Sequence, residues 1–184
     1  MATAETFVGL FELAIATGLM FARISRPTAQ ILFSDKAVVT NYDGVPTLMF
    51  RAANCRGNRI VEAEVSVSLL RDTVTIEGET MRRFEELPVT RRRTPLFGMT
   101  WSVMHPIDAN SPLQGETRQS LVASNAEIVV VMSGLDETFV STIHARTSYA
   151  PDEIFWGRRF ADIFARDPAA GWLIDFRRFH ELDG

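Results

Sequence analysis

The first thirty residues constrain this chain more than any other part of it. Residues 7–22 form an apolar stretch with a single charged side chain, Glu12, and run directly into the basic segment 23–27. A helix over residues 3–21 has roughly the 20 residues needed to cross the hydrocarbon core of a bilayer. The segment therefore predicts one membrane-spanning helix at the start of the chain.

The charges that follow the apolar stretch predict its orientation. Arg23 and Arg26 form a basic collar, and Pro27 ends any helix near Arg26. Because positively charged flanks stay on the cytoplasmic side, the collar places the rest of the chain in the cytoplasm. We therefore divide the chain into a transmembrane helix with its collar, residues 1–26, and a cytoplasmic domain, residues 27–184.

Three other interpretations of the apolar segment are weaker. A secretory signal peptide has positive charge before its apolar core, whereas here the charge comes after it. A buried core helix would rarely be apolar nearly all round at the start of a soluble domain, and a surface helix would need a strongly polar face. The acids Glu5 and Glu12 are costly inside a span unless they face a protein interior or a water-filled path.

Most of the remaining chain has the pattern of β-strands. Residues 30–107 alternate strongly between apolar and polar side chains, and Asp43-Gly44 lies in a hairpin signal, because both positions tolerate the positive φ of a tight turn. In the clearest strand, residues 60–69, the side chains expected to face the core are Val61, Ala63, Val65, Val67 and Leu69, and those expected to face solvent are Glu62, Glu64, Ser66 and Ser68.

The second half of the chain adds strands and one short helix. Residues 127–132 predict a central strand because they are almost continuously apolar, and residues 139–146 alternate again. Residues 116–124 predict a short helix, and residues 156–164 with 172–176 predict a final strand pair. Many short strands separated by turn signals indicate a mainly β protein, a sandwich or a barrel, with a single domain after the apolar segment.

Composition excludes several classes of function. The net charge is −4, which disfavours a nucleic-acid-binding protein. The single cysteine, Cys55, cannot form an internal disulfide and suits a reducing compartment. The three histidines are scattered and give no zinc-type cluster. The basic run 91–93 is expected to form solvated or inter-subunit ion pairs.

No catalytic pattern stands out. His105, Asp108 and Ser111 are the residue types of a hydrolase triad, but they fall within seven positions, whereas triad members usually come from separate parts of a chain. A polar turn between strands is the better interpretation, and the chain is not expected to be an enzyme. The residues alone therefore indicate a β-sandwich tethered by one membrane span. A tethered module that binds a partner, without channel activity, stays open as an alternative function.

A set of short sequence words then identifies a family. These words follow one another in family order over nearly the whole chain, at residues 22–29, 43–44, 46–51, 53–54, 61–63, 77–79, 104–108, 111–113, 115–117, 144–146, 148–149 and 153–157. In them the chain resembles the inward-rectifier potassium channels, and it is most similar to the prokaryotic branch of that family. It is similar to their C-terminal part, the inner pore helix and the cytoplasmic domain.

The resemblance implies an architecture. The cytoplasmic domain would be an immunoglobulin-like β-sandwich, and four identical chains would form a ring below the pore. The leading helix would line the pore, with Gly9 as a hinge and with Leu13, Thr17 and Phe21 on one face, Phe21 at the constriction. Leu13 stands where strongly rectifying relatives carry an acid, which puts strong block by polyamines in doubt.

The resemblance also implies contacts with ions and lipid. Arg23 and Arg26 match residues that meet anionic membrane lipid, and Glu79 matches an acid that attracts cations into the cytoplasmic vestibule. Gly134 and Leu135 match an apical loop that forms a second constriction. The implied permeant ion is K⁺, no cofactor is expected, and the expected location is the bacterial inner membrane. The chain is also predicted to belong with the voltage-gated channels.

The chain departs from the family pattern in one respect. It has no run like the Thr-x-Gly-Tyr-Gly selectivity filter, and the first membrane helix and pore helix of the family have no counterpart in it. Since K⁺ selectivity depends on rings of filter carbonyls, the chain alone is not expected to conduct selectively. Its start at the inner helix, Met1-Ala2-Thr3, predicts a piece of a longer channel, which is a fragment, a truncated gene product or a deliberately shortened chain.

Overall fold

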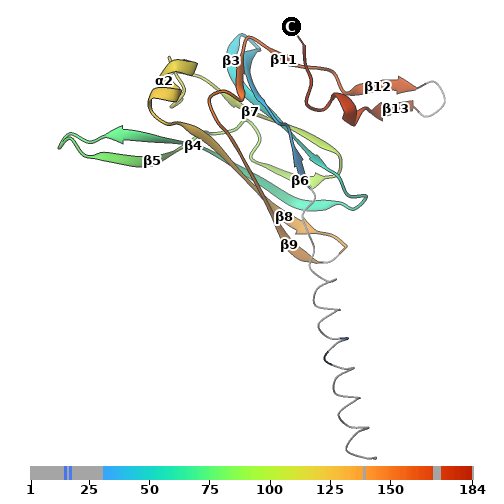
Figure 1. Cartoon of the computed structure of the whole chain (residues 1–184). Coiled ribbons are helices and arrows are strands. Elements are labelled where there is room, and N and C mark those ends of the chain that lie inside the picture. Colours follow the sequence, from blue (N-terminus) through green and yellow to red (C-terminus); the bar gives the residue numbers. More distant parts are fainter. Residues whose placement is uncertain (1–14, 16, 18–30, 139, 168–170, 184) are drawn as a thin grey trace, which may run out of the picture.

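The structure, a computed structural model, describes residues 15, 17, 31–138, 140–167 and 171–183 (Figure 1). Over these residues two sheets of five strands pack face to face. The first sheet comprises β1 (Ile31–Phe33), β2 (Ala37–Tyr42), β3 (Val45–Asn54), β7 (Thr100–Pro106) and β10 (Ile154–Trp156). The second sheet comprises β4 (Ile60–Val74), β5 (Thr80–Glu86), β6 (Arg93–Phe97), β8 (Glu127–Asp136) and β9 (Ser141–Tyr149). The predicted mainly β architecture is thus confirmed as a sandwich.

The hairpin predicted at Asp43-Gly44 is confirmed. β2 and β3 pair antiparallel up to Tyr42 and Val45, and the two residues between them have φ values of 50° and 81°. A two-residue turn with positive φ at both central positions matches the right-handed twist of the two strands that it joins. The local sequence therefore sets the register of β2 against β3.

The alternation predicted for residues 60–69 holds from Ala63 onward and fails before it. β4 contains a bulge, where its pairing with β8 shifts between Val61 and Glu64 and where Glu62 has a φ of 50°. The extra residue reverses the phase of the side chains. As a result Ile60 is buried and Val61, which we expected in the core, is only half-buried.

The central strand and the short helix are both where the sequence predicts them. β8 lies between β4 and β9, with Ile128, Val130 and Met132 buried. The helix α2 (Arg118–Ala123) begins after Thr117, whose side chain accepts a hydrogen bond from the backbone N–H of Ser120. This is the capping arrangement that satisfies a free N–H group at a helix start.

The predicted pairing of residues 156–164 with 172–176 holds only at its end, where Phe164 pairs with Ile174. The first segment is divided among three strands: β10 pairs in parallel with β2, β11 (Arg159–Phe160) pairs with β14 (Leu182–Asp183), and β12 (Phe164–Asp167) pairs with β13 (Gly171–Ile174). A short 3₁₀ helix, η1 (Phe176–Arg178), follows β13. Gly157, with a φ of 72°, separates β10 from β11, so these residues cannot form one continuous strand.

The main core lies between the two sheets. Aromatic pairs hold its centre, with ring centroids 5.5 Å apart for Phe50 and Tyr149 and 6.0 Å apart for Phe97 and Trp101. A smaller cluster, which includes Ile163 and Phe179, is buried outside this core. Among the described residues, no helix is long and apolar enough to cross a membrane.

Candidate functional site

The predicted constriction residues Gly134 and Leu135 lie in a strand and not in a loop. Gly134 pairs with Ile143 of β9, and Leu135 pairs with Thr142 of β9 and with Val61 of β4. β8 continues for one more residue, Asp136, and a turn begins at Glu137 (Figure 1). Gly134 and Leu135 therefore lie at the base of the β8–β9 turn, and the constriction stays a prediction.

Close packing against β4 explains why position 134 is a glycine. A Cβ atom at this position would lie 2.5 Å from Cγ2 of Ile60, 3.3 Å from Cα of Ala63 and 3.4 Å from the carbonyl oxygen of Val61. These atoms flank the β4 bulge, which brings the backbone of β4 close to β8. Gly134 thus allows the bulge to form and fixes the base of the β8–β9 hairpin.

Asp136 ties the same hairpin to a neighbouring loop. Its side chain is buried and accepts hydrogen bonds from Nδ2 of Asn58 at 2.7 Å and from the backbone N–H of Thr138 at 2.9 Å. It also forms an ion pair with Nη1 of Arg56 at 3.4 Å. A buried carboxylate with several donors is costly to disturb, because removing one partner leaves a charge without compensation.

The role of Asp136 was missed from the sequence, although a signal for it exists. Ile128, Val130, Met132 and Gly134 occupy alternate positions of β8, and Asp136 continues this inward-facing series. A carboxylate in the phase of the core must find donors, and the polar segment 54–59 supplies them.

Glu79, the predicted vestibule acid, lies at the far end of β4 from this hairpin. It is exposed in the turn between β4 and β5, where its N–H donates to the Thr75 hydroxyl at 3.2 Å and its carbonyl accepts from the Thr75 N–H at 2.8 Å. Figure 1 shows the β4–β5 hairpin extending away from the sandwich. β4 runs from Ile60 to Val74, so about 45 Å separates the two hairpin turns along the strand.

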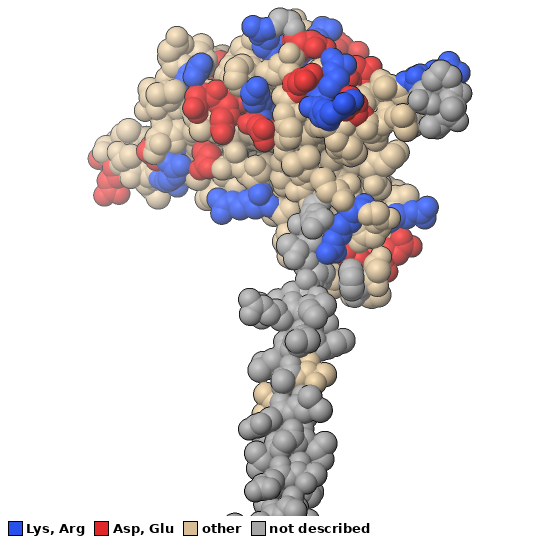
Figure 2. All heavy atoms as spheres, turned by 45° about the vertical axis from the view of Figure 1, so that its right-hand side comes forward, with Lys and Arg blue, Asp and Glu red and all other residues tan. Residues whose placement is uncertain are grey.

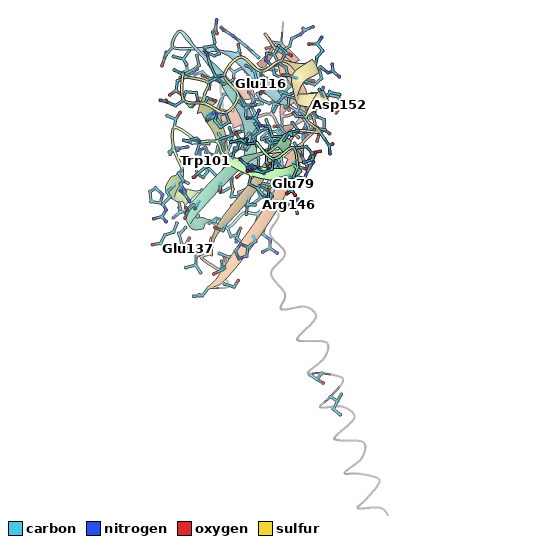
Figure 3. All side chains as sticks on the ribbon, turned by 90° about the vertical axis from the view of Figure 1, so that its left-hand side faces the viewer. Glu79, Trp101, Glu116, Glu137, Arg146 and Asp152 are labelled. Carbon is cyan, nitrogen blue, oxygen red and sulfur yellow. The ribbon has the colours of Figure 1, made fainter. Side chains whose placement is uncertain are left out.

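Glu77 shares the turn with Glu79. The pKa of its exposed carboxyl is lowered from the ordinary value by hydrogen bonds from its own backbone and from Thr75. Both carboxylates lie in the same exposed turn. Glu79 lies far from Gly134 and Leu135, which lie against the opposite end of β4. Figure 3 shows Glu137, in the β8–β9 turn, at one extremity of the domain.

The arginine run forms the ion pairs expected of it. Arg92 pairs with Glu64 at 2.8 Å, Arg93 pairs with the same carboxylate at 3.0 Å, and Arg91 lies over the ring of Trp101 at 4.9 Å. The hydrogen bond from Arg93 is the main reason that the pKa of the exposed Glu64 carboxyl is lowered. Basic and acidic side chains are interspersed in the same way on the face shown in Figure 2, which leaves no large single-sign patch there.

His105 and Ser111 form part of a polar turn and not of a triad. Nδ1 of His105 lies 2.6 Å from the Pro88 carbonyl, so it carries the proton, and Nε2 accepts from the Ser111 hydroxyl at 2.7 Å. The carboxylate of Asp108 accepts from the backbone N–H of Asn110 and makes no hydrogen bond to the ring within the described residues. Burial lowers the pKa of His105, which keeps the ring neutral.

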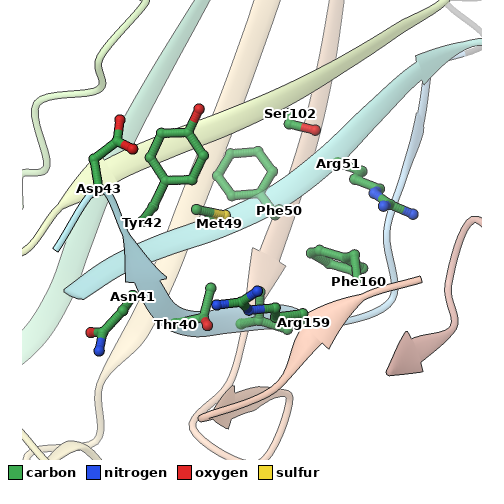
Figure 4. Close-up of a pocket in the computed structure, with 11 residues that line it drawn as sticks. Thr40, Asn41, Tyr42, Asp43, Met49, Phe50, Arg51, Ser102, Arg159 and Phe160 are labelled. Atoms are coloured by element: carbon green, nitrogen blue, oxygen red, sulfur yellow. The ribbon is translucent and has the colours of Figure 1, made fainter. Parts of the chain in front are cut away.

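A hollow of about 390 Å³ lies beside β2, β3, β7 and β11, with Arg51 at one side (Figure 4). Nη2 of Arg51 donates to the carbonyl of Ala161 at 2.6 Å, and the guanidinium lies 4.6 Å from the centre of the Phe160 ring. Burial lowers the pKa of Arg51. Arg51 therefore fastens the C-terminal segment to the outer face of the first sheet.

Most of the membrane-side residues cannot be compared with the structure. Gly9, Leu13, Phe21, Arg23 and Arg26 lie outside the described residues. Thr17, the only predicted pore residue of the leading helix that is described, has a helical backbone and an exposed side chain. Within the described part of the chain, no group of three His, Cys, Asp or Glu side chains could hold a metal ion.

Comparison with known proteins decides the family. Residues 31–183 match the family model described as the inward rectifier potassium channel C-terminal domain. This chain belongs to the inward rectifier potassium channel family. The predicted similarity to this family is thereby confirmed, over the sandwich and the C-terminal segment alike.

Similar inward rectifiers come from bacteria and from animals. The chain is 43% identical over 182 residues to Kirbac3.1 of Paramagnetospirillum magnetotacticum, which covers 99% of this chain and 62% of that protein. It is 34% identical to G protein-activated inward rectifier potassium channel 1 of Bos taurus, over 96% of this chain and 36% of that protein. ATP-sensitive inward rectifier potassium channel 12 of Mus musculus is also 34% identical, over 98% of this chain and 44% of that protein.

These identities confirm the likeness to the prokaryotic branch, since the bacterial inward rectifier is the more similar. This chain spans at most 62% of the length of these three relatives. Our grouping with voltage-gated channels is wrong, because the matched family is that of the inward rectifiers. Voltage sensing by a channel relies on a helix rich in arginine, which is a different device.

Proposed function

We propose that this chain forms the inner-helix gate and the cytoplasmic vestibule of an inward-rectifier K⁺ channel of the bacterial inner membrane. Four copies surround one axis, with residues 1–26 in the membrane and residues 27–184 in the cytoplasm. The observation that carries the proposal is the family match over residues 31–183, together with 43% identity to Kirbac3.1 over nearly the whole chain.

The proposed gate has two constrictions. In the membrane, Leu13, Thr17 and Phe21 line the conduit below the hinge at Gly9, and a ring of four Phe21 side chains excludes water when it is narrow. In the cytoplasm, the four β8–β9 hairpins form the second constriction beyond Gly134 and Leu135. The fixed base of this hairpin supports that role, because a constriction requires a rim of defined shape.

Anionic lipid is the proposed regulator of the membrane gate. Arg23 and Arg26 follow the span directly, and each gains about 1 kcal/mol near an anionic membrane surface. Lipid that binds one arrangement of the helices better than the other shifts the equilibrium between them.

Glu79 is the proposed source of cation attraction in the vestibule. Its carboxylate is exposed on an extended hairpin, so four copies would present four negative charges to a shared space. A cavity lined by one sign of charge raises the local concentration of the opposite ion, here K⁺. This role requires that the β4–β5 turns face the axis.

The tetramer provides the direct test. The full chain is incorporated into lipid nanodiscs, and its mass is measured by light scattering and native mass spectrometry. We expect four copies per particle. In a Cys55→Ser background, Val140→Cys in the β8–β9 turn should form cross-links between copies, because the four turns meet near the axis. Val122→Cys on α2, which is also exposed and lies at the other end of the domain, is the matched control and should not cross-link. A monomer in both measurements would refute the proposal.

A further inference from the structure

The core of the sandwich opens to the surface at the end that carries α2. A cavity of about 290 Å³ lies there, close to the lower end of the range for small-molecule sites. Its wall includes residues of both sheets, of α2 and of the segment before α2: Val39, Leu48, Leu113, Leu121, Ile128 and Ile154. Figure 3 shows Glu116, at the edge of this cavity, at the end of the domain opposite Glu137.

Among the described residues that line the cavity, Glu116 is the one ionisable side chain, and its charge is already paired. One carboxylate oxygen of Glu116 pairs with Nη1 of Arg71 at 2.6 Å, and the other accepts a short hydrogen bond from the Ser120 hydroxyl. Arg71 also pairs with Glu85 at 2.9 Å. Because Glu116 has both oxygens occupied, the cavity offers little attraction to a cation and suits an apolar group.

The mouth of the cavity, unlike its apolar interior, carries an exposed positive charge. A second hollow, of about 380 Å³, shares Glu116, Ile154 and Trp156 with the cavity and is also lined by Arg118. Arg118 is exposed and makes no hydrogen bond or ion pair with any residue that the structure describes. Trp156, 38% exposed, lines both hollows.

We propose that these two hollows bind one medium-chain amphiphile, with its apolar tail in the cavity and an anionic carboxylate head on Arg118. Apolar lining inside and an unpaired guanidinium outside match the two ends of such a molecule. The ligand would touch Val39 and Leu48 of the first sheet and Ile128 of the second. It would therefore stiffen the joint between the sheets. The inference goes beyond the proposed function and does not depend on the tetramer.

Methyl NMR of the full chain in nanodiscs tests the proposal with two matched probes, octanoate and 1-octanol. Octanoate should shift the methyl signals of Leu121, Ile128 and Ile154 in a saturable manner and should bind more tightly than octanol. Arg118→Gln should weaken octanoate binding about tenfold, as expected for the loss of a hydrogen bond to a charged group, and should leave octanol binding unchanged. Arg83→Gln, an exposed arginine on β5, is the matched control and should change neither.

Filling the cavity separates binding from partition into the bilayer. Leu121→Phe should abolish the shifts for both probes, and Ile154→Phe provides a second variant should the first disturb folding. Three results would overturn the proposal: shifts that rise without saturation, equal affinity for octanoate and octanol, or an Arg118→Gln variant that binds octanoate as the parent does. None of these results bears on the number of chains in the channel.

Discussion

Replacing Gly134 with alanine should destabilise the domain by an amount set by its packing against the β4 bulge. The added Cβ would lie 2.5 Å from Cγ2 of Ile60, a distance that real Cβ contacts do not reach. Relief requires movement, but Ile60 is buried in a stiff β-branched rotamer and the other neighbours, Ala63 and Val61, contribute backbone atoms. Overpacking of this kind costs about 1–3 kcal/mol. The expected fall in the midpoint of thermal unfolding is about 3–10 °C.

The assay compares unfolding of the parent and Gly134→Ala chains in identical nanodiscs by calorimetry. Gly98→Ala is the matched control, since a Cβ there meets nothing within 4 Å and the backbone needs no positive φ. This control should be neutral or slightly stabilising, because alanine reduces the entropy of the unfolded chain.

A second substitution isolates the contact itself. Ile60→Leu removes Cγ2 while keeping the side-chain volume, so the double variant Ile60→Leu/Gly134→Ala should recover part of the loss. The reasoning would be refuted if Gly134→Ala unfolded within about 0.5 kcal/mol of the parent, or if Ile60→Leu gave no recovery.

Substitutions at three further positions address the bulge, the polar turn and the vestibule. Glu62 has a φ of 50°, which glycine adopts easily and valine does not, so the Glu62→Gly variant should unfold at a higher denaturant concentration than the Glu62→Val variant. We expect their free energies of unfolding to differ by about 1–2 kcal/mol. Equal unfolding midpoints would show that the backbone at this position is not strained. Burial lowers the pKa of His105 below its unfolded value of about 6.5, so the unfolded chain binds more protons there and stability should be constant above that pH and fall below it. His105→Gln should flatten this fall in pH-dependent denaturation. When the chain is joined to a filter-bearing pore, Glu79→Lys should reduce K⁺ current several-fold at low salt and less at high salt; an unchanged current would exclude the vestibule role.

Local signals predicted the parts of the fold that depend on neighbouring residues. Asp43-Gly44 fixes the first hairpin through its own φ values, and Thr117 begins α2 through its own hydroxyl. The apolar run at the start of β8 was enough to place that strand inside a sheet. Each of these features is decided within a few residues, which is why the sequence reveals it.

Features decided by distant partners escaped prediction. The phase of Val61 depends on a bulge that forms against Gly134, more than 70 positions away in the chain. Ile154 pairs in parallel with Ala37, and the pattern of apolar residues in either segment does not predict that pairing. The donors that satisfy the buried carboxylate of Asp136 come from Asn58 and Arg56, which only the fold brings to it.

The same long-range contacts bear on how the proposed cytoplasmic constriction would change its width. Gly134 packs on the β4 bulge, and Asp136 is bound to the segment that precedes β4, so one stretch of chain holds the hairpin at two points. Bending the hairpin alone would open a void at Gly134 and break buried hydrogen bonds of Asp136. We therefore expect the hairpin to move with its sheet. In a ring of four chains, the distance between Val140 residues would then follow the placement of whole domains, and spin labels at Val140 and Val122 should report correlated changes.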